Sequence, residues 1–94
     1  MSKFKLGTTA FTRRVNDRVA EDSNFSQFVL LALLKYKRGD WGDMSEDDKQ
    51  ANDEAVTEGD RILAAYTYPM DGTKIWIITE ADRSATTVLF PDEY

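Results

Sequence analysis

The last 21 residues of this 94-residue chain, Lys74 to Tyr94, constrain its fold more than any other segment. They read KIWIITEADRSATTVLFPDEY: an apolar strand, a polar turn, a second strand and a tail of proline, acids and an aromatic residue. The preceding segment, RILAAYTY, has the same strand-like composition and is followed by the turn sequence PMDG. Short β-rich runs separated by turn residues are typical of antiparallel hairpins. We therefore predict an antiparallel meander with strands at residues 61–68, 74–80 and 85–90.

The strongest helical pattern lies in residues 23–37, where Ser23 is the expected N-cap. Apolar residues recur at helical spacing and predict one buried face. They are Phe25, Phe28, Val29, Ala32, Leu33 and Tyr36. Leu30, Leu31 and Leu34 widen this stripe beyond what one sheet face needs. The helix is therefore either sandwiched between two elements or exposes an apolar patch to a partner.

A second helix is predicted at residues 46–58, with Ser45 as its N-cap and Gly59 as its end. Its apolar stripe is thin and consists of Ala51, Ala55 and Val56. Most of its surface is therefore expected to face water.

The N-terminal part of the chain adds a strand and a short helix. Residues 3–12 carry β-branched and aromatic side chains and predict a strand with a bend at Gly7. A short helix follows Thr12, because Val15 and Val19 lie one turn apart with charged residues between them.

These elements together predict an α+β fold. We expect one domain, residues 1–94, in which an antiparallel sheet of three to four strands packs against two to three helices. On the middle strand, Ile75 and Ile77 share one face, while Trp76 and Ile78 share the other. The predicted core consists of Phe25, Phe28, Val29, Leu33, Ile75, Ile77 and Leu89.

The charge of the chain is unevenly distributed. The net charge is −5, yet residues 40–60 carry nine acids and one base, Lys49, so the rest of the chain is positive. The acids of this segment are Asp40, Asp43, Glu46, Asp47, Asp48, Asp53, Glu54, Glu58 and Asp60. The bases gather at Arg13, Arg14 and Arg18 and again at Lys35, Lys37 and Arg38. The molecule is therefore expected to have an acidic side.

Several classes of chemistry are excluded by residue content. The chain has no histidine and no cysteine, so it has neither a Ser-His-Asp triad nor a common zinc site. It contains no glycine-rich phosphate loop, and its acidic segment does not match the EF-hand spacing. We predict a protein that is not an enzyme and needs no cofactor or metal.

The polar turn at residues 79–84 also has a structural interpretation. We expect Asp82 to hydrogen-bond the turn backbone and Arg83 to pair with a neighbouring acid. The longest apolar run, residues 28–34, is far shorter than the roughly 20 residues that cross a bilayer. The N-terminus has no apolar signal segment, so we expect a cytoplasmic protein without membrane contact.

Three segments carry a family resemblance: GDWGD at 39–43, NDEAVTEGDRILAAY at 52–66, and the C-terminal residues 74–94. They resemble a family of small uncharacterised proteins encoded largely on phages, plasmids and conjugative elements of Gram-positive bacteria. Some relatives are labelled as restriction-system proteins, although this chain lacks the length and the methyltransferase motifs of such a subunit. The resemblance implies no catalytic residues. It implies a setting in which small acidic proteins block a host defence complex, such as a CRISPR effector or a restriction enzyme.

The acidic segment suggests how such blocking would work, because exposed carboxylates can occupy a basic groove in place of nucleic acid. The predicted partner is therefore a protein, a nucleic-acid-binding defence complex. Trp41 is either a plug that packs its loop down or an exposed anchor for that partner. The predicted partner-binding residues are Asp40, Trp41, Asp43, Glu46, Asp47, Asp53, Glu54 and Glu58.

Two alternatives remain open at this stage. The first is that the acidic face is merely solvated. The second is a small DNA-binding transcriptional or plasmid-maintenance regulator that uses Arg13, Arg14, Arg18, Lys35 and Arg38, although the negative net charge argues against direct nucleic-acid binding. A homodimer is compatible with either function.

Overall fold

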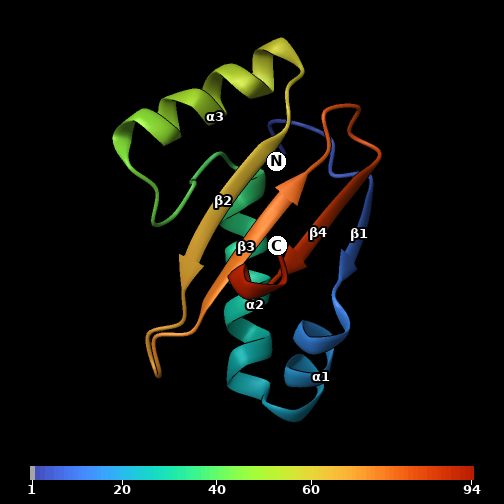
Figure 1. Cartoon of the computed structure of the whole chain (residues 1–94), viewed down its shortest axis with the longest axis vertical. Coiled ribbons are helices and arrows are strands. Elements are labelled where there is room, and N and C mark those ends of the chain that lie inside the picture. The colour runs from blue at the N-terminus through green and yellow to red at the C-terminus, as the bar shows by residue number, and fades with distance from the viewer. Residues whose placement is uncertain (1) are drawn as a thin grey trace.

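The computed structural model describes residues 2–94 and confirms the α+β fold (Figure 1). In this part of the chain, three helices accompany one four-stranded sheet. The strands are β1 (Thr8–Phe11), β2 (Ile62–Thr67), β3 (Lys74–Thr79) and β4 (Ala85–Leu89). The helices are α1 (Arg13–Glu21), α2 (Ser23–Lys37) and α3 (Glu46–Glu58), with a final 3-10 turn, η1 (Pro91–Glu93).

The sheet has the strand order β1-β4-β3-β2. The predicted β2-β3-β4 meander is confirmed as antiparallel, with Ile77 opposite both Ala64 and Val88. The N-terminal strand joins the sheet, but it pairs with β4 in parallel, so the sheet is mixed. It is also shorter than predicted, because Gly7 has a φ of +63° and lies against the β3–β4 turn. A Cβ at Gly7 would lie 2.4 Å from the carbonyl oxygen of Ser84, so the bend requires glycine.

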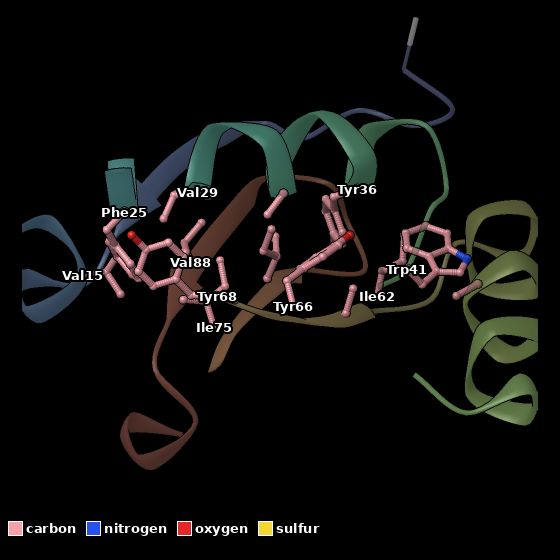
Figure 2. Packing of buried hydrophobic residues seen from close by; sticks show 14 residues of the cluster. Val15, Phe25, Val29, Tyr36, Trp41, Ile62, Tyr66, Tyr68, Ile75 and Val88 are labelled. Atoms are coloured by element: carbon pink, nitrogen blue, oxygen red, sulfur yellow. The ribbon is translucent and has the colours of Figure 1, made fainter. Parts of the chain in front are cut away.

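The helix α2 crosses one face of the sheet, and the core lies between them (Figures 1 and 2). The helix contributes Phe25, Val29, Ala32 and Tyr36, all of which are buried. The sheet contributes the predicted Ile75 and Ile77, together with Ile62, Ala64, Tyr66 and Val88, and Tyr68 adds to the core directly after β2. Two predicted core residues, Phe28 and Leu33, lie at the margin of the cluster and are only partly buried. Leu89 is buried, but it pairs with Trp76 on the opposite face of the sheet.

The sandwiched arrangement proposed for α2 is wrong. Leu30, Leu31 and Leu34 are 58%, 53% and 47% exposed, so the helix covers the sheet with one face and presents leucines to solvent on the other. No helix formed by residues 2–94 is both long and apolar enough to span a membrane.

A chain of hydroxyl groups crosses the core. The Thr86 hydroxyl donates to the Leu6 carbonyl at 2.7 Å, which uses its only proton. The 2.7 Å contact between Thr79 and Thr86 must therefore be donated by Thr79, and the 2.7 Å contact between Tyr36 and Thr79 by Tyr36. Burial raises the pKa of Tyr36 to about 12, so the donor proton stays in place. This series of hydroxyl groups links α2, β3 and β4 to the N-terminal segment, and each hydrogen bond is donated in the direction of Leu6.

Side chains define the start of each helix. Asp22, rather than the predicted Ser23, caps α2, because its carboxylate accepts from the backbone N–H groups of Asn24 and Phe25 at 3.1 and 3.2 Å. Ser45 caps α3 as predicted, by accepting from the N–H of Asp48 at 3.1 Å.

Candidate acidic interaction surface

The loop after α2 is attached to the β2 edge of the sheet. Gly42 forms a bridge with Ala65, and the Asp43 N–H donates to the Ala65 carbonyl at 2.7 Å. The approach is so close that a Cβ at Gly42 would lie 2.3 Å from that carbonyl oxygen. The Tyr66 hydroxyl donates to the Asp40 carbonyl at 2.7 Å, and burial raises the pKa of Tyr66. These contacts join the loop to the β2 edge of the sheet and fix where α3 begins.

Trp41 plugs this loop into the core. Its side chain is 2% exposed, and its ring centroid lies 5.6 Å from that of Tyr36 and 5.9 Å from that of Phe4. Its indole N–H donates to the carboxylate of Asp53 on α3 at 2.9 Å. Figure 2 shows the indole nitrogen directed toward α3. Trp41 is therefore not an exposed anchor, which corrects its place among the predicted partner-binding residues. Its role is to position α3.

The helix α3 is tied to β2 by an asparagine. The Asn52 side-chain amide donates to the Leu63 carbonyl at 2.9 Å and accepts from the Leu63 N–H at 3.4 Å. It thus takes the place of a neighbouring strand on the edge of the sheet. Asn52 is 6% exposed, whereas Ala51, expected to be apolar and packed, is exposed. The sequence gives a weak signal for Asn52, which is a polar residue one turn before the buried Ala55.

Arg83 caps the C-terminal end of α3. Its guanidinium donates to the carbonyls of Ala55 at 2.9 Å and of Asp60 at 2.7 Å. The prediction that Arg83 pairs with an acidic side chain is therefore wrong, since its partners are backbone carbonyls at the helix C-terminus. Asp82 accepts from the Ser84 N–H at 3.0 Å, which confirms its predicted role in the turn.

The exposed acids of this region form what we call the acidic surface. It comprises the carboxylates of Asp40, Asp43, Glu46, Asp47, Asp48, Asp53, Glu54 and Glu58, which all belong to exposed residues. Within residues 2–94, only Glu46 of this set forms an ion pair, with Lys49 at 3.7 Å. The described residues contain no group of three or more acids arranged to hold a metal ion. The acidic surface is therefore a field of largely unpaired negative charge.

The two ends of α3 differ in how they tolerate these charges. Glu46, Asp47 and Asp48 lie in the first turn, where the helix dipole stabilises negative charge. The last turn has no base, and Glu54 and Glu58 lie one turn apart near the C-terminus. The Arg83 guanidinium on the Ala55 carbonyl offsets the dipole at this end, whereas the repulsion between Glu54 and Glu58 acts against folding.

The basic residues of the regulator hypothesis lie at two sites. Arg13, Arg14 and Arg18 belong to α1, which precedes the start of α2. Lys35 and Arg38 lie at the opposite end of α2, about 20 Å away at 1.5 Å per residue. In addition, Arg14 pairs with Asp92 at 3.0 Å, and Arg18 pairs with Asp71 and lies 4.4 Å above the Phe25 ring. The structure does not bring these bases together into one patch.

Comparison with known proteins adds no relative. No family model, no curated protein and no solved structure matches the chain. The resemblance to mobile-element proteins stays a prediction, and the geometry of the acidic surface carries the functional argument.

Proposed function

We propose that this chain is a non-catalytic, mobile-element protein that binds and inhibits a host defence complex, either a CRISPR effector or a restriction enzyme. The acidic surface occupies a basic groove of the complex where nucleic acid would otherwise bind. Inhibition is stoichiometric, because the protein acts by occupying its target and not by turnover.

The observation that carries this proposal is the position of Glu54 and Glu58. They are exposed, lack a basic partner among the described residues and lie one turn apart on α3, where like charges repel each other. Exposed charges contribute little to stability even when they are paired, about 0–1 kcal/mol for each pair. A binding function accounts for acids that the fold does not need.

The attachment of α3 supports the same function. Hydrogen bonds from Asn52, Trp41 and Arg83 hold the helix while leaving its outer side free. The carboxylates are therefore displayed on a fixed support, so less ordering is required on binding. Unpaired charge of one sign also speeds encounter with a basic groove, and this effect weakens as salt is added.

The experiment titrates the purified protein against purified RNA-guided nucleases and type I restriction enzymes of Gram-positive bacteria, with DNA cleavage as the readout. We expect one enzyme to be inhibited at close to one protein per binding site. Glu54→Lys with Glu58→Lys should weaken inhibition at least about tenfold at low salt. The matched control, Asp17→Lys with Glu21→Lys, reverses two exposed acids one turn apart on α1, makes the same change in net charge on another surface and should still inhibit.

Asp53 needs a different substitution, because reversing its charge would also remove the acceptor for Trp41. Asp53→Asn removes the charge and keeps a side-chain oxygen for the indole N–H. We expect this variant to fold normally and to inhibit less.

Three outcomes would contradict the proposal: no inhibition at excess protein, complete inhibition by substoichiometric protein, or equal inhibition by the Glu54→Lys/Glu58→Lys variant. A salt-sensitive gel shift with duplex DNA would instead favour the regulator hypothesis.

A further inference from the structure

The strand β1 forms an open edge of the sheet. At the opposite edge, the loop around Gly42 and the helix α3 bond to β2, whereas β1 is the outermost strand beyond β4 (Figure 1). Thr8 and Thr12 donate their backbone N–H groups, at 3.0 and 3.1 Å, to carbonyl groups on β4 and the turn before it. Main-chain groups alternate in direction along a strand, so those of Thr9 and Phe11 point away from β4. Each of these two residues therefore offers one donor and one acceptor to a further strand.

An apolar hollow, which we call the β1 groove, lies between this edge and α2. Its volume is about 330 Å³. Because side chains alternate between the faces of a strand, a strand added to β1 would place every second side chain on the face that holds the groove. Leucines line most of the groove, which favours apolar side chains at those positions. The residues that line it are Leu6, Thr9, Leu30, Leu33, Leu34 and Lys37.

The β1 groove continues into a basic hollow before the start of β1. This second hollow, of about 500 Å³, shares Leu6, Thr9 and Lys37 with the groove. The charged residues that line the two hollows are Lys5, Lys37 and Arg83, with no acid among them. Arg83 is occupied by backbone carbonyls, whereas none of the ion pairs formed within residues 2–94 involves Lys5 or Lys37. The two lysines are therefore available to carboxylates of a ligand.

We propose that this edge binds an extended segment of another protein, which adds to β1 as a further strand and carries apolar residues followed by acids. Main-chain hydrogen bonds to Thr9 and Phe11 hold the segment, its apolar side chains enter the β1 groove, and its carboxylates meet Lys5 and Lys37. Antiparallel pairing is the more stable kind per residue, and it brings the C-terminal end of the segment to the lysines. A second copy of this chain does not match this chemistry, because its open edge is β1 itself and residues 3–16 contain no acid.

The length of β1 sets the expected affinity. The strand has four residues, so few main-chain hydrogen bonds can form, and we expect weak binding that exchanges rapidly. The inference is independent of the proposed function, because it uses neither α3 nor the acidic surface. Failure of the protein to inhibit a defence enzyme would leave it standing.

The first test uses a short synthetic peptide of alternating valine and threonine that ends in a pair of aspartates. Titrated into the isotope-labelled protein, the peptide should shift the amide NMR signals of Thr9 and Phe11. Lys37→Glu should weaken binding at least about threefold. The matched control, Lys35→Glu, makes the same charge change in the same turn of α2 and should bind as the wild type does, because Lys35 lines a different hollow on the β2 side of the helix.

Methylation of the peptide backbone tests strand addition itself. N-methyl groups on the peptide nitrogens that face β1 should abolish binding, whereas N-methyl groups on the intervening nitrogens should be tolerated, because only the first set donates to β1. Moving the aspartates to the N-terminal end of the peptide should weaken binding, and an unchanged affinity would contradict the antiparallel arrangement.

Four outcomes would overturn the proposal. They are the absence of shifts at β1 with millimolar peptide, equal binding of the two methylated peptides, equal losses for Lys35→Glu and Lys37→Glu, and a mass above 10.7 kDa with shifted β1 signals in the protein alone. The last outcome would assign the edge to a second copy of the chain.

Discussion

The helices α2 and α3 are held to the same sheet by different forces. The helix α2 buries Phe25, Val29, Ala32 and Tyr36 against it. The helix α3 buries only Asn52 and Ala55, and it is held by hydrogen bonds from the Asn52 amide, the Trp41 indole and the Arg83 guanidinium.

Because of this difference, the helix that contributes most to stability is not the helix that carries the acidic surface. Hydrophobic burial is roughly proportional to the apolar area removed from water, so α2 contributes most to global stability. A few directed hydrogen bonds fix the position of α3 without requiring a wide apolar face, and its remaining surface is free to carry charge. We therefore expect substitutions in α2 to unfold the protein and substitutions in α3 to act locally.

The largest expected effect is at Phe25, which is fully buried on α2. Phe25→Ala should lower the free energy of unfolding by about 3–5 kcal/mol, measured by urea denaturation. Phe28→Ala should cost clearly less, because Phe28 lies at the margin of the core. Equal losses at the two positions would show that the margin of α2 packs as tightly as its centre.

The hydroxyl chain predicts an ordered pair of smaller effects. Thr86→Val removes the donor to the Leu6 carbonyl and the acceptor for Thr79, so it should cost about 1–3 kcal/mol. Tyr36→Phe leaves only an acceptor site on Thr79 unused and should cost about 1 kcal/mol. If thermal unfolding showed that Tyr36→Phe costs more stability than Thr86→Val, the assigned direction of donation along the hydroxyl groups would be contradicted.

Asn52 tests the attachment of α3. Asn52→Ala leaves the Leu63 N–H and carbonyl without their partner and should cost about 1–2 kcal/mol. Amide hydrogen exchange should accelerate in α3 and remain slow in α2. The exposed neighbour Gln50→Ala serves as the control, with a change within about 0.5 kcal/mol. Uniform acceleration in both helices would show that α3 is part of the same cooperative core.

The smallest expected effect has the opposite sign. Glu58→Lys should stabilise the protein by about 0.3–1 kcal/mol at low salt, because it replaces the repulsion between Glu54 and Glu58 by an attractive Glu–Lys pair one turn apart. The gain should shrink in high salt, as screening weakens surface charges. Urea denaturation at two salt concentrations measures both effects, and destabilisation at low salt would refute the claim that Glu58 opposes folding.

The meander and α2 could be predicted from the sequence, because hydrophobic periodicity is a local signal. The burial of Ile75 and Ile77 followed from strand alternation in the same way. The parallel pairing of β1 could not be predicted, since it depends on the close approach of Gly7 to a turn far away in the chain.

The acidic residues of the candidate site were visible in the sequence as a charge cluster, but their support was not. Each contact joins residues that are far apart in the sequence. Asn52 and Leu63 are 11 positions apart, Trp41 and Asp53 are 12 apart, and Arg83 and Ala55 are 28 apart. Each depends on where α3 lies on β2, which no local pattern encodes. Asp53 therefore looked like any other surface acid, although it also accepts the Trp41 indole N–H.

The most direct test of the central claim is the association rate constant of the Glu54→Lys/Glu58→Lys variant with the inhibited defence enzyme, measured at low and high salt. The account predicts a rate at least about tenfold below that of the wild type at low salt, with the difference shrinking at high salt, in a protein that is no less stable. The Asp17→Lys/Glu21→Lys control should keep most of the wild-type rate. If the two variants associate equally fast, the acids of α3 are only a solvated face of the molecule.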